Sequence, residues 1–392
     1  MKTIQRLSTD LDVERIIKQL THDVSGTFNL GFLFVSSFSK SKTAEIFAAL
    51  KNKIDVVNIL SCSCAGVLSI DIEIELKPAC SLILMQFDDV RITPFYFTQS
   101  QIEDFTEEDD WYNALNVYPN ESPKFIAMPN PFSIDMSLFV EGINEAYPDC
   151  PVVGGLISGD TRSRENSLHL NDTQYDEGMI GVILTGNINM HTIVSQGCRP
   201  FGKNYIVTKA DGNIIYELAG QPLYEILQKE LEQASMKDKI LAQEAIFLGV
   251  AMDEYIHKLR RGDFLIRMLL GIDENIGAGA VADYIEQGQT VQFHVRDAIS
   301  ATEDLHIMLE KQKQNYSQLK PEAILAFSCT GRGENFFREK NHDVDIIKKY
   351  MGNVPLSGFF SAGEIGPVGG ENFIHSFTIS LALFYSPEGY DK

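Results

Sequence analysis

The feature that most constrains the fold of this chain is a pattern that occurs three times along it. In each copy an apolar, strand-like segment is followed by a helix-like segment, a second apolar segment and a stretch of small residues, at 61–67, 151–159 and 354–367. From the start of the first strand-like segment to the end of the small residues, each copy spans roughly 35–45 residues, a length typical of a duplicated supersecondary unit. The sequence therefore predicts repeated strand–helix–strand–strand units.

The expected elements have the same order in each copy. We expect the first strands at 28–35, 124–128 and 323–328, the helices at 42–51, 133–146 and 343–351, and the last strands at 79–87, 178–184 and 375–385. Strands that alternate with helices indicate an α/β (mixed α+β) fold, with mixed sheets covered by helices. Between the second and third copies, 205–218 carries a hairpin signal, and an antiparallel block is expected to follow. A chain of 392 residues favours two domains, here 1–200 and 201–392.

Composition excludes some classes of function. A net charge of -21 argues against nucleic-acid binding, which requires clustered basic residues. The N-terminus lacks the apolar segment of a secretory signal, and the longest apolar runs are strand-sized. We therefore expect a cytoplasmic protein without membrane insertion. Its six cysteines are then expected to be reduced and buried.

The third small-residue stretch holds the predicted binding site. Its glycines permit close approach of a ligand to the backbone, and Glu364 is its only carboxylate. Arg332 precedes the stretch and His375 follows it; Ser361 and Gly363 lie within it. An arginine suits a ligand carboxylate, and a glutamate suits an ammonium group. The alternative is an internal Arg332–Glu364 ion pair with a capping histidine, and the sequence leaves both open.

No motif of nucleophilic or metal-dependent catalysis is present, so we do not expect an enzyme. A thiol-dependent enzyme is the weaker alternative, because Cys62, Cys64 or Cys329 would each need a nearby histidine.

Segments 195–202, 292–298 and 327–333 resemble the FIST sensory proteins, as do 355–367 and 375–378. The resemblance covers nearly the whole chain, as an N-terminal FIST domain followed by a C-terminal FIST domain. It implies a signal-input module that binds a small ligand, with amino acids proposed for the family. It also implies an output partner in a separate chain.

Stand-alone FIST proteins of about this length also resemble the nitric-oxide-sensing haem proteins, which regulate a partner histidine kinase or cyclic-di-GMP enzyme. His294 and His375 are the candidate haem ligands. A strand histidine such as His294 is more often structural, and a haem-free sensor of amino-acid-like metabolites is the alternative.

Overall fold

The chain folds into two compact units. The structure is a computed structural model that describes residues 1–159, 166–253, 258–259, 262–316 and 319–386. Unit 1 comprises residues 1–194 and 305–392, and unit 2 comprises 195–304. Unit 2 begins near the expected boundary at residue 200, but the chain returns to unit 1 after residue 304. The compact units therefore do not coincide with the division into 1–200 and 201–392.

The described residues of unit 1 form three six-stranded sheets with equivalent strand orders. The first sheet has the order β1 (Lys2–Ser8), β6 (Ala79–Gln86), β2 (Thr27–Ser36), β3 (Asp55–Cys64), β10 (Leu168–Leu170) and β11 (Thr173–Tyr175). The second has the order β7 (Val90–Phe97), β12 (Met179–Gly186), β8 (Lys124–Pro129), β9 (Val152–Gly155), β23 (Glu364–Val368) and β24 (Glu371–His375). The third has the order β13 (Asn189–Gln196), β25 (Thr378–Tyr385), β21 (Ala323–Cys329), β22 (Leu356–Ser361), β4 (Gly66–Ser69) and β5 (Ile72–Glu75).

The predicted repeat is confirmed by the strand pairing. In each copy the first two strands are parallel, as β2–β3, β8–β9 and β21–β22. The last strand of each copy then returns antiparallel to the first, as β6, β12 and β25. A parallel pair needs a crossover connection, and the predicted helix supplies it in every copy. The mixed α/β fold class is therefore confirmed.

A hairpin in each copy leaves its own sheet and extends the sheet of another copy. The hairpin β4–β5 of the first copy pairs with β22 of the third, β10–β11 pairs with β3, and β23–β24 pairs with β9. This cyclic exchange ties the three sheets together, and the sequence did not predict it. The strand expected at 375–385 is present as β25 but begins at Thr378, because Phe377 has a φ of 61° and separates it from β24, which ends at His375.

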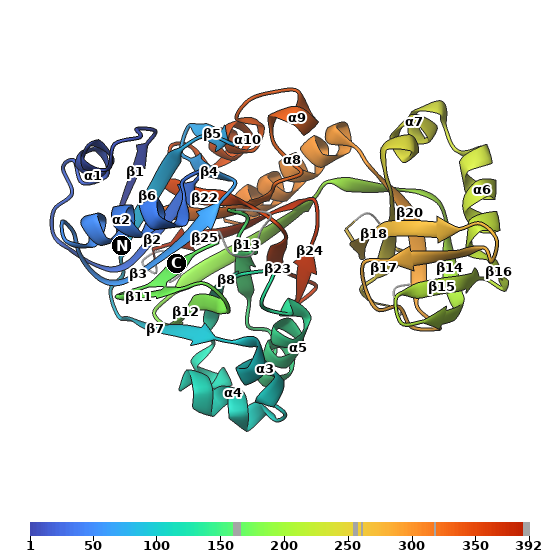
Figure 1. Ribbon diagram of the computed structural model, residues 1–392, viewed down its shortest axis with the longest axis horizontal. Coiled ribbons are helices and arrows are strands. Elements are labelled where there is room, and N and C mark those ends of the chain that lie inside the picture. The colour runs from blue at the N-terminus through green and yellow to red at the C-terminus, as the bar shows by residue number, and fades with distance from the viewer. Residues whose placement is uncertain (160–165, 254–257, 260–261, 317–318, 387–392) are drawn as a thin grey trace. The chain divides into compact units, whose positions relative to one another are not determined.

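Helices cover the outer faces of the three sheets. In Figure 1, α1 and α2 accompany the first sheet, and α3, α4 and α5 lie together beside the second. The described helical elements of unit 1 are α1 (Val13–Leu20), α2 (Lys40–Lys51), α3 (Gln99–Asp104), α4 (Glu108–Leu115), the 3-10 turn η1 (Pro119–Glu121), α5 (Met136–Ala146), α8 (Ala298–Asn315), α9 (Glu334–Phe337) and α10 (His342–Met351). Helix α8 begins in unit 2 and continues into unit 1. Separate apolar clusters join the helices to each sheet.

The inner faces of the sheets pack on one another and form the central core of unit 1. Phe34 of the first sheet lies 5.1 Å from Phe359 of the third, measured between ring centroids, and Phe327 lies 5.4 Å from Phe359. Ile126 and Val182 of the second sheet belong to the same buried cluster. Because both faces of these strands are buried, their sequences are nearly continuous apolar runs rather than alternating patterns.

In its described residues, unit 2 is an antiparallel sheet with two helices. Its strands are β14 (Cys198–Asp211), β15 (Ile214–Leu218), β16 (Gln221–Pro222), β17 (Ile246–Ala251), β18 (Phe264–Asp273), β19 (Ala278–Val281) and β20 (Thr290–Arg296), and its helices are α6 (Leu223–Gln233) and α7 (Met236–Glu244). The predicted hairpin is β14–β15. Across the part of the chain that the structure describes, no helix is long and apolar enough to cross a membrane.

Two of the parallel pairs depend on a glycine at the same relative position. A Cβ atom at Gly358 would overlap the carbonyl oxygen of Ala326, and one at Gly154 would overlap that of Ala127. We expect Gly358→Ala to lower the free energy of unfolding by about 3 kcal/mol or more, because a backbone contact in the core cannot move aside. Gly363→Ala is the matched control, since its Cβ atom would lie 3.5 Å from Leu156. Urea unfolding of both variants tests this, and equal stabilities would contradict it.

Candidate functional site

The small-residue turns that end β3, β9 and β22 meet one another in unit 1. The backbone N–H of Ala65 donates to Ser158 Oγ at 3.0 Å, and Ser158 Oγ donates to the carbonyl of Phe360. The N–H of Leu156 donates to the carbonyl of Gly363 at 2.8 Å. The sequence predicts equivalent small-residue turns at the ends of three strands, and in the structure these three turns contact one another directly.

Close packing at this junction explains why the turns are made of small residues. A Cβ atom at Gly155 would lie only 2.8 Å from Cβ of Ser361, and one at Gly66 would lie 2.9 Å from the Phe360 ring. Larger side chains would separate the turns.

Glu364 follows the third turn and is completely buried. Its Oε1 accepts from Ser361 Oγ at 2.7 Å, and its Oε2 accepts from the backbone N–H of Thr378 at 3.1 Å and from Thr378 Oγ1 at 2.8 Å. Burial raises the pKa of Glu364 to about 7, although these donors and the charge of Arg332 oppose the shift. The carboxyl group is therefore near its titration midpoint at neutral pH.

Arg332 is also buried, and its charge is balanced by Asp343 at the start of α10. Nε and Nη2 of Arg332 donate to the two carboxylate oxygens of Asp343, each at 2.8 Å. The guanidinium carbon lies 5.0 Å from the centroid of the Phe337 ring. The third nitrogen, Nη1, is buried and has no hydrogen-bond acceptor among the described residues. Although burial alone would raise the pKa of Asp343, the charge of Arg332 holds it far below its usual range.

A chain of hydrogen bonds connects these two charged groups. Ser328 Oγ donates to Asp343 Oδ2 at 3.0 Å, and the carbonyl of Ser328 accepts from Ser361 Oγ at 3.2 Å. The Arg332–Glu364 network consists of Arg332, Asp343, Ser328, Ser361, Glu364 and Thr378. The alternative of an internal ion pair between Arg332 and Glu364 is not observed, because Arg332 pairs with Asp343 instead.

His375 and Gly363 lie beside this network. His375 is the cross-strand partner of Glu364, and its Nε2 lies 2.9 Å from the carbonyl oxygen of Gly366. Gly363 is close to the backbone of His375, because a Cβ atom there would lie 3.6 Å from the His375 carbonyl oxygen. The structure thus brings all five residues of the predicted binding site into one region of unit 1. Whether they bind a ligand stays a prediction.

His294 lies in unit 2 on β20, and its ring is enclosed. Its Nδ1 is 3.0 Å from the carbonyl oxygen of Gln292, and its ring centroid is 5.2 Å from that of Phe264. A Cβ atom at Gly249 would lie 2.6 Å from Nδ1 of His294. Both His294 and His375 are almost completely buried. An axial haem ligand needs an imidazole that faces a cavity wide enough for the porphyrin, so these two histidines as placed do not fit that role.

Sequence reasoning did not identify Asp343, Thr378 and Glu73 as parts of this region. An acidic residue in the first turn of a predicted helix is ordinarily explained by the helix dipole, so Asp343 gave no distinctive signal. Glu73 arrives on the exchanged hairpin β4–β5, where its Oε1 accepts from the N–H of Val344 at 2.9 Å. Burial, and then the charge of Asp343, raise the pKa of Glu73 to about 8.

The three cysteines considered as nucleophiles are buried thiols. Burial raises the pKa of Cys329 to about 12, and it also raises the pKa values of Cys62 and Cys64 well above that of an ordinary thiol. They are therefore protonated at neutral pH, and a thiolate is the reactive form of a cysteine. Within the described ranges, no group of three or more His, Cys, Asp or Glu residues is placed to hold a metal ion.

Comparison with known proteins identifies the two domains and several relatives of this chain. Residues 29–221 match the FIST N domain, and residues 224–367 match the FIST C domain. The chain is 34% identical over 359 residues to an uncharacterized protein of Mycobacterium tuberculosis strain H37Rv, covering 92% of each chain. It is 33% identical over 364 residues to an uncharacterized protein of Mycobacterium bovis, covering 91% of this chain and 90% of the relative.

A shorter segment is similar to a human protein. Over 75 residues, 15% of this chain and 19% of the relative, it is 35% identical to human F-box only protein 22.

This protein belongs to the FIST family, whose domains are associated with sensing in signal transduction.

Proposed function

We propose that this protein is a sensor of a small zwitterionic, amino-acid-like metabolite, which it binds at the Arg332–Glu364 network. The observation that carries the proposal is the buried Nη1 of Arg332, which has no acceptor among the described residues. A buried, unpaired donor costs free energy, and a ligand carboxylate would remove that cost. Glu364 has a raised pKa, and a ligand ammonium group beside it would lower that pKa, so that the carboxyl group loses its proton and pairs with the ammonium.

The burial of the network supports a sensory role. Arg332 and His375 are each 2% exposed and Glu364 is 0% exposed, so a ligand would reach them only after the surrounding segments move. A ligand that binds one conformation better than another shifts the population toward it. Ligand binding here would therefore be coupled to a conformational change that an output protein can detect. We propose a histidine kinase or a cyclic-di-GMP enzyme in a separate chain as that output protein.

Calorimetric titration with a panel of free amino acids tests the ligand proposal. We expect saturable binding of at least one member, and no binding of its N-acetylated or carboxamide derivative, each of which lacks one charge. Glu364→Gln should weaken binding about tenfold or more, since hydrogen bonds to charged groups contribute about 1.5–3 kcal/mol. Glu45→Gln, an exposed glutamate on α2, is the matched control. No heat with any amino acid, or equal affinity in Glu364→Gln, would reject the proposal.

A haem-based nitric oxide sensor is the second candidate function. The absorption spectrum of the purified protein supplied with haem distinguishes it. Stoichiometric binding with a Soret band that is lost in His294→Ala or His375→Ala would favour the haem sensor over the amino-acid sensor. A featureless spectrum is expected, given the enclosed histidines.

A further inference from the structure

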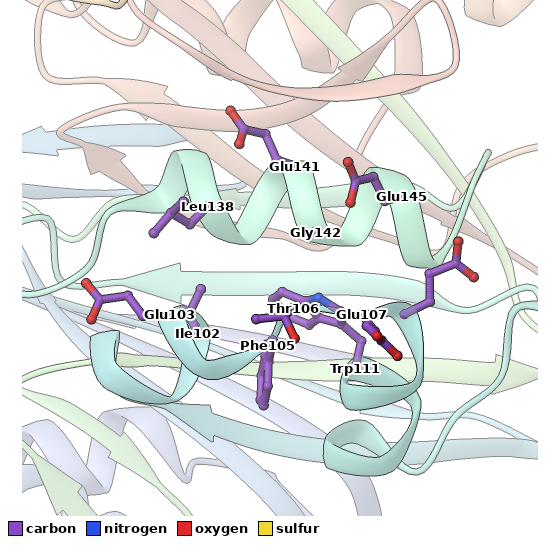
Figure 2. Close-up of a pocket in the computed structure, with 11 residues that line it drawn as sticks. Ile102, Glu103, Phe105, Thr106, Glu107, Trp111, Leu138, Glu141, Gly142 and Glu145 are labelled. Atoms are coloured by element: carbon purple, nitrogen blue, oxygen red, sulfur yellow. The ribbon is translucent and has the colours of Figure 1, made fainter.

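A groove in unit 1 lies between α5 and the two short helices α3 and α4, away from the Arg332–Glu364 network. Its volume is about 340 Å³, at the lower end of pockets that hold small ligands. Figure 2 shows Leu138, Glu141 and Glu145 of α5 on one wall, with Glu103, Glu107 and Trp111 on the other.

The walls of this groove are strongly acidic. They carry five carboxylates and no basic residue: Glu103, Glu107, Glu108, Glu141 and Glu145. Within the described part of the chain, Glu103, Glu107, Glu108 and Glu145 form no ion pair with a lysine or arginine. Glu103 accepts a hydrogen bond from Gln99, and Glu108 accepts one from Tyr112. These four carboxylates give the groove a negative field, which would concentrate cations.

The floor of the groove supplies a second and independent indication of a ligand. Trp111 is only 4% exposed, and its indole N–H has no hydrogen-bond acceptor among the described residues. The ring packs directly against the backbone of α5, since a Cβ atom at Gly142 would lie 2.6 Å from Cε2 and 2.8 Å from Nε1 of Trp111. Figure 2 shows the indole nitrogen on the side that faces α5. The indole nitrogen is not one of the fully buried side-chain atoms that lack a partner, so its N–H is accessible from the groove and can donate to an acceptor oxygen of an occupant.

These features together specify the chemistry of the occupant. The carboxylates select a cation, and the Trp111 and Phe105 rings can accommodate an aliphatic stem and attract its charge. The accessible indole N–H can donate to a neutral acceptor oxygen close to that stem. A lysine or arginine residue combines all three, because its backbone carbonyl lies beside its aliphatic side chain. We propose that this groove docks a basic side chain of a polypeptide partner, with a backbone carbonyl of that partner accepting from Trp111.

Trp111 is the single tryptophan of the chain, so its fluorescence reports on this groove directly. We expect the peptide acetyl-Ala-Lys-Ala-amide to change Trp111 emission with a saturable dependence on concentration. The analogue acetyl-Ala-norleucine-Ala-amide keeps the aliphatic stem but lacks the ammonium group, and it should bind at least about tenfold more weakly. Hexylammonium has the charge and the stem but no acceptor oxygen, and should also bind more weakly than the lysine peptide.

Two variants on opposite walls test the role of the carboxylates. Glu107→Gln and Glu145→Gln should each weaken the lysine peptide by about three- to fivefold, as expected for exposed charge pairs, and this difference should shrink in high salt. Glu45→Gln on α2 is the control and should bind like the unchanged protein. Gly142→Ala should displace the indole, shift its emission and abolish binding.

Three results would overturn the proposal. The first is an equal response to the lysine and norleucine peptides. The second is unchanged affinity in the Glu107→Gln, Glu145→Gln double variant, which removes charge from exposed positions and should leave folding intact. The third is binding of hexylammonium or choline without binding of the lysine peptide, which would indicate a free small cation as the occupant.

Discussion

Replacing Asp343 by alanine is expected to destabilise unit 1 by about 3–5 kcal/mol, because it leaves the guanidinium of Arg332 buried without a counter-charge. Asp343 accepts two hydrogen bonds from Arg332 and one from Ser328, and both charged side chains are almost fully buried. The loss therefore combines an uncompensated charge with broken hydrogen bonds. Urea unfolding followed by the fluorescence of Trp111, which lies in the same unit, measures it.

A double variant separates the cost of an unpaired charge from the contribution of the pair. Arg332→Met with Asp343→Leu removes both charges and keeps apolar volume at each position. Replacing a buried ion pair by apolar residues is often neutral in stability, so we expect the double variant to recover most of the loss. If the double variant is as unstable as Asp343→Ala, the unpaired charge is not the cause. Recovery of stability without recovery of amino-acid binding would identify the pair as functional.

The stability of the protein is expected to fall as the pH rises from about 4.5 to about 7, because Glu364 has a raised pKa in the folded state. Over this range the folded protein keeps a proton that the unfolded chain has released, so raising the pH favours unfolding. A shift from 4.5 to about 7 corresponds to about 3 kcal/mol at most. Glu73, whose pKa is raised to about 8, acts in the same direction.

Glu364→Gln isolates the contribution of Glu364 to this pH dependence. Its amide oxygen can accept from Thr378, while its NH2 group donates to Ser361 Oγ, which still reaches the carbonyl of Ser328. We expect the variant to match the unchanged protein near pH 5 and to exceed its stability at pH 8. Glu45→Gln should follow the unchanged protein throughout. Parallel curves for Glu364→Gln and the unchanged protein would show that burial does not raise this pKa.

The repeat could be read from the sequence because it depends on local order. Each crossover from β2 to β3, β8 to β9 and β21 to β22 lies within one continuous segment. Apolar strand segments, a helix between them and a small-residue turn are properties of neighbouring residues. The same reasoning placed Arg332, Ser361, Gly363, Glu364 and His375 near one another, since all five lie in the third copy. It could not assign the hydrogen-bond partners, which depend on side-chain packing.

The sequence by itself therefore determined the α/β class, the three repeated units and the region of the predicted site. Only the tertiary structure decided that the hairpins β4–β5, β10–β11 and β23–β24 pair with other copies, and that residues 195–304 form an inserted unit. Ser357 pairs with Ser69, which is far away in the chain, and Glu73 reaches α10 on that same hairpin. The physical reason is that these pairings form when the three sheets pack together and bury their apolar faces against one another. The pattern of apolar residues within one segment does not specify which distant strand will pair with its edge.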